Sequence, residues 1–286
     1  MILELAIGDA YGAGFEYVRD RRFIKNNNDL SSYIKHPRHN RKKGVYTDDA
    51  QMSIAIAELI LEEDKWTPEL IASKFLEVFH RDKRGGYAGG FQAFLKKTKS
   101  GKEFIENIRP TSDKSGAAMR SGPIGVYATI EEVISRSNQQ ASITHNTRDG
   151  KNAAIVASLM THYFLYDLGP KSDLPGFLCK NVEGKWDEPW RGEVGSRGWM
   201  SVRAAITSIT KNNSLSSILK SSVAWTGDTD TVATIALAAA SCSDEIVKDI
   251  PEVLIKNLEN RKYGRDYLIS LDKKLMKCKR KSEFRR

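Results

Sequence analysis

Apolar side chains recur at helical spacing along most of the chain. In residues 49–62 they fall on one face, which predicts a helix there. Thr67-Pro68-Glu69 is a helix start, with a capping hydroxyl, a proline at the first position and an acid in the first turn. This helix should end near His80. Further helices are predicted at 123–136, 150–166, 199–211, 214–224, 229–242, 251–259 and 264–276.

The other segments add little regular structure. Glycines at 85–90 predict a loop, and the Pro- and Gly-rich stretch 168–198 is expected to be irregular. Alternating strand patterns are scarce, and no internal repeat or domain boundary is visible. We therefore expect an all-α protein, a compact single-domain bundle of many helices over residues 1–276, followed by a basic tail at 277–286.

Composition is ordinary for a globular protein. The chain has 286 residues, of which 40% are hydrophobic and 28% charged. No apolar run approaches the roughly 20 residues that a membrane span needs. The apolar N-terminus carries Glu4 and Asp9 and lacks a basic start, so we do not expect a secretory signal. The three cysteines form no Cys-x-x-Cys pair, which favours a reducing cytoplasm over a disulfide framework or a zinc site.

The net charge of +9 is concentrated in two runs, at 35–43 and 273–286. A basic run is most often a solvated face or tail. It can also attract an anionic substrate or nucleic acid. The 35–43 run contains no aromatic residue on which bases could stack. Nucleic acid therefore remains the less favoured partner.

Two short acidic clusters lie about 180 residues apart, and each opens an apolar helix. The first is Thr47-Asp48-Asp49 and the second is the run Gly227 to Thr231, GDTDT. An acidic side chain at a helix start is often only a cap. A cap uses one side chain, however, and each cluster has two. Carboxylate and hydroxyl oxygens suit a hard cation such as Mg²⁺ or Mn²⁺.

With an upstream Thr-Asp-Asp, this Gly-Asp-Thr-Asp-Thr sequence resembles the ADP-ribosylglycohydrolase family, which includes the dinitrogenase-reductase-activating glycohydrolases. Other family-like segments follow in the same order, across about residues 2–251. They are GDAYG at 8–12, RGGYAGG at 84–90, GAAMRSGPIG at 116–125, Thr144-His145, Gly198-Trp199 and Ile250-Pro251. The resemblance implies the same all-α fold.

The resemblance also implies a binuclear metal site for two Mg²⁺ ions, with Mn²⁺ as the alternative. Its ligands would be Thr47, Asp48, Asp49, Asp228, Asp230 and Thr231. Four carboxylates balance two divalent cations in formal charge. One departure is Thr226, where family members commonly have a second glycine, so the shape of that loop is open.

Three acids are candidate catalytic residues: Glu16, Asp48 and Asp49. Glu16 has the spacing from Gly8 of a mobile gating glutamate in the family, and a carboxylate beside activated water can act as a general base. Its alternative is an exposed charge at a helix end. Asp9 is expected to accept hydrogen bonds from neighbouring N–H groups rather than to bind metal.

Five residues are candidates for binding the substrate. Ser121 and Gly122 lie at a glycine-rich helix entry of the kind that can cradle a diphosphate. The resemblance places His145 near the distal ribose, although a lone histidine is usually structural. Tyr87 and Trp199 are candidate stacking surfaces, although aromatic residues more often pack in the core.

The sequence therefore predicts a metal-dependent hydrolase that releases ADP-ribose from an acceptor by cleaving the glycosidic bond at the distal ribose. The acceptor is expected to be a protein side chain, with a small ADP-ribose conjugate also possible. Two alternatives stay open: a non-catalytic ADP-ribose-binding or structural protein on the same fold, and an ADP-ribosyl-nucleic-acid hydrolase. No membrane partner is expected, and the sequence leaves the oligomeric state open.

Overall fold

The computed structural model describes the backbone of residues 1–62 and 65–283 and the side chains as far as Lys277. Within this part the protein is built from helices, with no β-strand. The N-terminal half contains α1 (Ile2–Gly12), α2 (Arg21–Asn27), α3 (Asp48–Glu62), α4 (Pro68–Arg81), α5 (Gly89–Lys97), α6 (Gly101–Asn107), α7 (Gly116–Met119), the 3₁₀ helix η1 (Gly122–Val126) and α8 (Ile130–Ser142). The rest contains α9 (Arg148–Leu165), α10 (Leu174–Asn181), α11 (Gly198–Thr210), α12 (Leu215–Ala224), α13 (Thr229–Ala240), α14 (Glu252–Asn257) and α15 (Arg265–Glu283).

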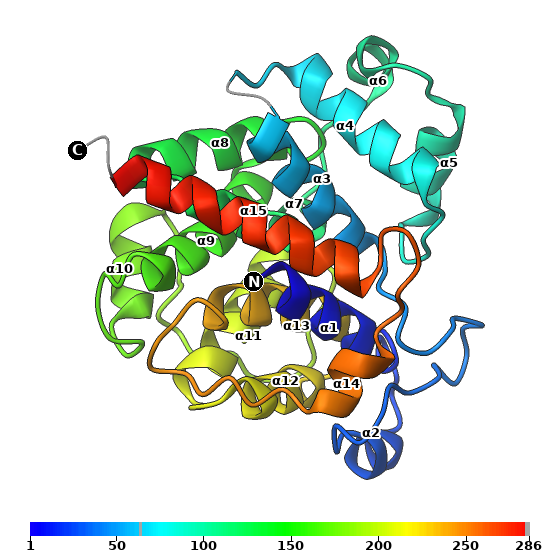
Figure 1. Cartoon of the computed structure of the whole chain (residues 1–286), viewed down its shortest axis with the longest axis vertical. Helices are drawn as coiled ribbons and strands as arrows, with labels where there is room; N and C mark the ends of the chain where they lie inside the picture. Colours follow the sequence, from blue (N-terminus) through cyan, green and yellow to red (C-terminus); the bar gives the residue numbers. More distant parts are fainter. Residues whose placement is uncertain (63–64, 284–286) are drawn as a thin grey trace.

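Helices α1 and α13 form the centre of the molecule, and nearly every residue of both is buried. Glycines let them approach closely. A Cβ atom at Gly8 would lie 2.7 Å from the Ala233 carbonyl oxygen, and one at Gly12 would lie 2.5 Å from the Asp230 Cα. Helices α3, α9, α11 and α12 pack around this pair, and α15 crosses over α1 and α3 (Figure 1). The tight α1–α13 contact brings the start of α13 beside the end of α1.

The predicted all-α fold is confirmed. Two predictions within it were wrong. Residues 123–136 are not one helix, because the chain leaves the 3₁₀ turn η1 and α8 starts afresh at the Thr129 cap, whose hydroxyl accepts a hydrogen bond from the Glu132 N–H. The segment 168–198 is not wholly irregular, because it contains α10, which has Pro175 in its first turn. Helix α15 also continues past the predicted 264–276 to Glu283.

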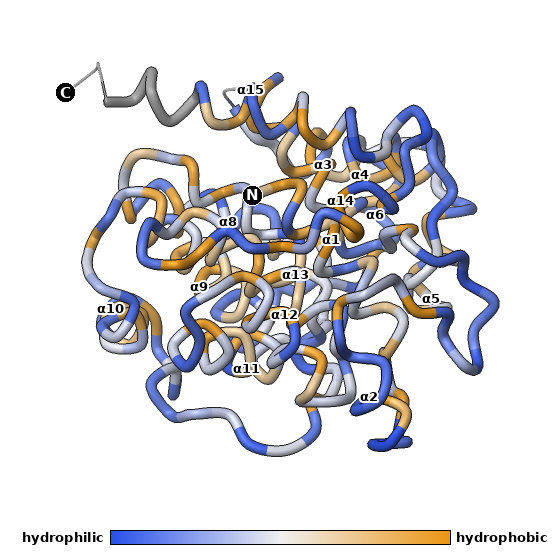
Figure 2. The backbone as a smooth tube through the Cα atoms, turned by 60° about the horizontal axis from the view of Figure 1, so that its bottom comes forward, coloured by the Kyte–Doolittle hydropathy of each residue, from blue (hydrophilic) through white to orange (hydrophobic). Residues whose placement is uncertain are grey.

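Peripheral elements surround the core. Helices α4, α5 and α6 make a lobe at one corner, and α2 lies at another (Figure 1). The hydropathy view shows polar positions over α2 and the outer loops, with apolar positions in the central helices (Figure 2). No helix in the described part is both long and apolar enough to cross a membrane.

Candidate active site

The first acidic cluster is held by a carboxylate from another helix. Asp9, near the end of α1, accepts hydrogen bonds from the backbone N–H groups of Thr47 and Ala50 and from the Thr47 hydroxyl, each at 2.8 Å. Asp9 therefore caps α3, as expected of a structural acceptor. The side chains of Asp48 and Asp49 are therefore not needed to cap α3. Asp49 Oδ1 is buried and has no hydrogen-bond partner in the described structure, as expected of an oxygen that binds a cation.

The second cluster lies at the start of α13. Asp228 occupies the N-cap position but makes no capping bond, and its Oδ2 accepts a hydrogen bond from the Ser201 hydroxyl at 3.2 Å. The preceding loop is fixed by Val194, whose N–H donates to the Thr226 carbonyl and whose carbonyl accepts from the Asp228 N–H. Thr226 adopts φ +66°, which glycine adopts more easily. The family departure at this position is thus accommodated by a left-handed threonine.

Glu16 joins the second cluster. One carboxylate oxygen each from Glu16, Asp228 and Asp230 lie within 4.8 Å of one another. Arg41 forms an ion pair with Glu16, with Nη1 2.7 Å from Oε2. The Glu16 backbone carbonyl also accepts from His36 Nε2 at 2.8 Å. Two contacts from the 35–43 run therefore hold Glu16 beside the aspartates.

Burial makes this group of acids electrostatically unstable as free carboxylates. Burial, reinforced by the neighbouring acids, holds the pKa of Asp48, Asp49 and Asp230 well above the ordinary value. The same cause raises the pKa of Asp228 to about 6. A bound divalent cation would remove this penalty, because it supplies the missing positive charge. The oxygen-only donor set and the unpartnered Asp49 oxygen fit a hard cation.

The acids line a cavity of about 600 Å³. Its lining includes seven of the predicted site residues: Glu16, Asp48, Asp49, His145, Asp228, Asp230 and Thr231. The same lining also contains apolar and basic side chains: Phe91, Phe94, Ile108, Arg109 and Lys114. A cavity of this size, lined by both acids and cations, can hold an extended ligand with both hydroxyls and anionic groups.

His145 lines the cavity and is hydrogen-bonded on its Nδ1 side. Arg120 Nη2 donates to the Thr144 hydroxyl at 2.9 Å, and this hydroxyl lies 2.7 Å from His145 Nδ1. We assign the hydroxyl proton to Nδ1 and the His145 proton to Nε2, an arrangement in which the hydroxyl accepts from Arg120 and donates to the imidazole. Burial and the nearby Arg120 charge lower the pKa of His145 to about 3. His145 is therefore a neutral hydrogen-bond donor.

Five of the predicted residues with substrate or metal roles lie outside the cavity lining. Ser121 is fully buried, and its hydroxyl donates to the Ala117 carbonyl and accepts from Gln140 Nε2. A Cβ at Gly122 would meet Ala238 at 2.9 Å. Both residues thus pack within the protein, and their substrate contact stays a prediction.

The two aromatic candidates are also displaced from the lining. The Tyr87 hydroxyl donates to Gln51 Oε1 at 2.6 Å, and its ring packs edge-on against Phe79. Trp199 lines a separate hollow of about 300 Å³ with Trp186 and Arg203. Thr47, a predicted ligand, contacts Asp9. Their predicted roles remain untested.

Sequence reasoning missed two residues that shape the site. The basic run pointed to Arg41 only as part of a charged loop, because its pairing with Glu16 joins two irregular segments. Gly86 was part of a glycine-rich loop, and the structure shows why it is needed. It has φ +108°, and a Cβ there would lie 1.8 Å from Asp48 Oδ1.

The fold and site together define an all-helical protein with a carboxylate-rich cavity suited to divalent metal. Comparison with known proteins makes the class specific. The ADP-ribosylglycohydrolase family profile matches residues 1–283. The chain belongs to the ADP-ribosylglycohydrolase family, as its motifs indicated.

Individual relatives are more distant. ADP-ribosylhydrolase ARH3 of Xenopus tropicalis is 29% identical over 208 residues, which cover 68% of this chain and 57% of the relative. The human ARH3 is 25% identical over 235 residues, covering 70% of this chain and 63% of the relative. The matches thus span less than two thirds of these relatives. A solved structure described as an ADP-ribosylglycohydrolase-related protein complex has a TM-score of 0.77 at 22% identity, covering 97% of this chain and 96% of that one, which shows a shared fold.

Proposed function

We propose that this protein is a metal-dependent hydrolase that removes ADP-ribose from an acceptor, most often a protein side chain. The bond cleaved would be the glycosidic bond between the distal ribose and the acceptor. The observation that carries this proposal is that Glu16 and both aspartate clusters line a single cavity, with Glu16 close to Asp228 and Asp230. Family membership supports the ADP-ribose part of the substrate.

The residues that would hold metal are Thr47, Asp48, Asp49, Asp228, Asp230 and Thr231. Two Mg²⁺ ions suit this oxygen-only set, and Mn²⁺ has the same ligand preference. When bound, such ions polarise substrate oxygens and lower the pKa of water. The protein contributes a prearranged set of acids, since Asp9 takes over the capping of α3.

Glu16 is the proposed general base. It lies beside the aspartates, and its ion pair with Arg41 orients it. Its carboxylate would accept a proton from the attacking water, and the departing acceptor would take up a proton from solvent as its bond to the ribose breaks. The ribose carbon should develop oxocarbenium character, as in other glycoside cleavage. His145, as a neutral Nε2–H donor, would orient the sugar by a hydrogen bond.

The test is a panel of defined ADP-ribosylated substrates. Purified protein with Mg²⁺ or Mn²⁺ should release ADP-ribose from at least one arginine- or serine-linked peptide, and excess chelator should abolish the release. A nucleic-acid conjugate belongs in the same panel. Silence on every conjugate, with metal binding demonstrated by calorimetry, would favour the non-catalytic binding protein. Given its cysteine pattern, we expect the protein to work in the cytoplasm.

A further inference from the structure

One segment beside the cavity is strongly basic. Residues 19–43 contain nine Lys or Arg and two Asp, so this segment alone has a net charge of +7. Eight of the cations are exposed, and we call them the basic rim: Arg19, Arg21, Arg22, Lys25, Lys35, Arg38, Lys42 and Lys43.

The basic rim is not neutralised by the protein itself. Among the ion pairs of the described residues, this segment contributes Arg41 alone. Its two acids are occupied by the backbone. Asp20 accepts from the Arg22 and Phe23 N–H groups at the start of α2, and Asp29 accepts from the Ser31 N–H. Exposed cations without partners are available to an external anion.

The rim adjoins the acids that line the cavity. His36 and Arg41 contact Glu16, and Arg38 donates to the Tyr17 carbonyl. Glu16 and Tyr17 both line the cavity. Under the proposed function the bond to be cleaved lies near the carboxylates, so the acceptor side of this bond is also close to Glu16. The rim begins beside Glu16, which brings it within reach of an acceptor.

We propose that the basic rim docks the acceptor, and that this acceptor is a polypeptide segment with Asp and Glu residues flanking the modified side chain. This inference rests on the proposed function and adds the chemistry of the preferred acceptor. The rim supplies favourable charge pairs with the flanking acids, which increases capture of such substrates.

The rim fits an acidic polypeptide better than a nucleic acid. Single-stranded nucleic acid is bound by aromatic platforms as well as cations. The aromatic residues of the segment, Phe23 and Tyr33, are half-buried and buried. One hollow does combine an aromatic residue with cations of the rim, because Trp225 lines it together with Arg21 and Lys25. Nucleic-acid binding at this hollow is therefore tested in the experiment below.

The experiment uses three peptides that carry the same ADP-ribosylated residue between acidic, neutral or basic flanks, and a small ADP-ribose conjugate as reference. The rim variant is Lys35→Glu/Lys42→Glu/Lys43→Glu. The side chains of these lysines make no hydrogen bond or ion pair among the described residues. Its matched control is Lys97→Glu/Lys180→Glu/Lys211→Glu, which changes the net charge equally at exposed positions on α5, α10 and the end of α11.

For the unaltered protein, kcat/KM should be about tenfold higher on the acidic peptide than on the neutral one, as expected from a few exposed charge pairs. The rim variant should lose this preference, and the control variant should keep it. The preference should shrink with added salt. All three peptides carry the same ADP-ribose. Electrostatic attraction of ADP-ribose itself therefore cancels when kcat/KM on one peptide is divided by kcat/KM on another.

Equal kcat/KM on the three peptides, with the small conjugate hydrolysed, would overturn the rim proposal alone. No hydrolysis of any substrate would instead count against the proposed function. A single-stranded oligonucleotide that inhibits hydrolysis of the neutral peptide, with inhibition lost in Trp225→Leu, would assign the rim to nucleic acid and overturn the acidic-peptide proposal.

Discussion

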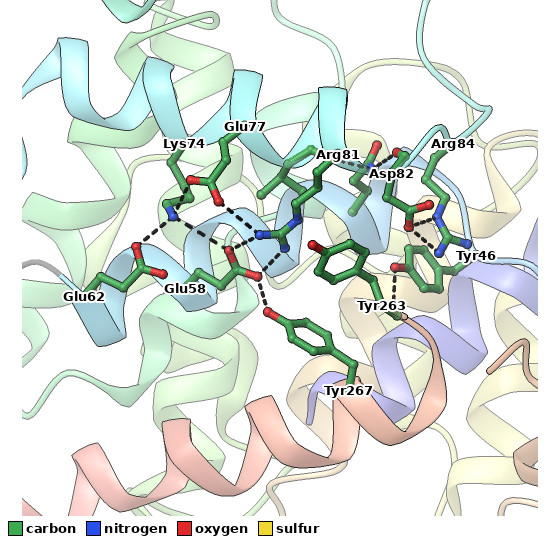
Figure 3. A network of polar contacts seen from close by, with 12 residues as sticks. Tyr46, Glu58, Glu62, Lys74, Glu77, Arg81, Asp82, Arg84, Tyr263 and Tyr267 are labelled. Carbon is green, nitrogen blue, oxygen red and sulfur yellow. Dashed lines mark hydrogen bonds and ion pairs between the residues drawn. The ribbon is translucent and has the colours of Figure 1, made fainter. Parts of the chain in front are cut away.

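Helix α3 carries buried charge at both ends, and the two groups are built in opposite ways. At its start, Asp48 and Asp49 face other acids across the cavity. Near its other end, Glu58 lies in a network of opposite charges that joins α3, α4 and α15 (Figure 3). Both groups are removed from water, so the difference lies in what compensates each charge.

The charges of the Glu58 network are paired within the protein, although Arg81 Nε is buried without a hydrogen-bond partner among the described residues. Glu58 accepts from Arg81 through both oxygens and from the Tyr267 hydroxyl of α15. Lys74 donates to Glu62 and Glu77, each at 2.7 Å. Every charged member has a partner of opposite sign, as Figure 3 shows. Such a network orders the packing of α15 on α3 and α4, and it leaves no charge for a ligand.

The cavity acids lack this compensation. Arg41 pairs with Glu16, whereas Asp49 keeps a buried oxygen with no partner among the described residues. Evolved buried charges are normally paired or bound to metal. We infer that the uncompensated acids at the start of α3 serve function, and that the paired charges near its other end serve stability. The predictions below test this division of roles between the two ends of α3.

The largest effect should follow Asp49→Asn. Losing a carboxylate ligand should weaken metal binding, measured by calorimetry, and lower kcat/KM by about 1000-fold or more, since metal contributes several kcal/mol to the barrier. Asp230→Ala should behave likewise. Near-native turnover in either variant would show that the two clusters do not form one site.

The same Asp49 substitution should stabilise the metal-free protein. Burial raises the pKa of Asp49, so the folded state binds a proton that the unfolded chain has lost. The associated stability is fully present below about pH 4 and is lost as pH rises through the folded pKa. Denaturant unfolding in chelator at pH 7 should therefore show a higher free energy of unfolding for Asp49→Asn. A lower value would mean that the cluster is structurally balanced.

At the other end of α3, Glu58→Gln should act on stability. It leaves Arg81 and Lys74 with fewer partners in a largely buried setting, which should cost about 2–3 kcal/mol of unfolding free energy. Glu77→Gln is the matched control, because its half-exposed carboxylate should cost less than about 1 kcal/mol. Turnover per folded molecule should stay native in both. Loss of turnover in folded Glu58→Gln would contradict the proposal that this end of α3 serves stability alone.

The sequence predicted one of these ends and not the other. Asp48, Asp49, Asp228 and Asp230 stand in short local patterns at helix starts, so their types and spacing alone indicated metal. Glu58 looks like an ordinary polar position of a helix. Its partner Tyr267 lies more than 200 residues away, and such a contact depends on how α15 packs.

Loop contacts were beyond sequence reasoning for a related cause. Apolar residues in 28–47 follow no helical or strand spacing. The sequence therefore does not predict which way the side chains of Arg41 and His36 point. The structure shows them against Glu16 because the loop folds back over the end of α1. Trp199 lines the hollow with Trp186 and Arg203, and its stacking role stays a prediction. The type of an aromatic residue does not specify which hollow its ring lines.

A smaller effect should follow a change beside the cavity. Thr144→Val removes the hydroxyl that contacts His145 Nδ1, so the imidazole should populate both tautomers. We expect about a tenfold rise in KM, in line with one lost or unsatisfied hydrogen bond. Nitrogen-15 NMR of His145 should show the mixed tautomers. Thr144→Ser keeps the hydroxyl and should restore the single tautomer, and a persistently high KM in that variant would contradict this role.

The smallest effect should come from removing the basic tail, Lys277 to Arg286. Helix α15 is anchored before this point by Leu268, Leu271 and Leu275, which are buried in the core. The Tyr267 contact to Glu58 also lies in the retained part. Truncation after Met276 should therefore leave kcat and KM on a small ADP-ribose conjugate within about twofold of native, at low and high salt alike. Kinetics with the conjugate across a salt series would check this. Lost turnover in a folded truncated protein would show that the tail supports the cavity, and charge balance at the Glu58 network would then not suffice to hold α15 in place.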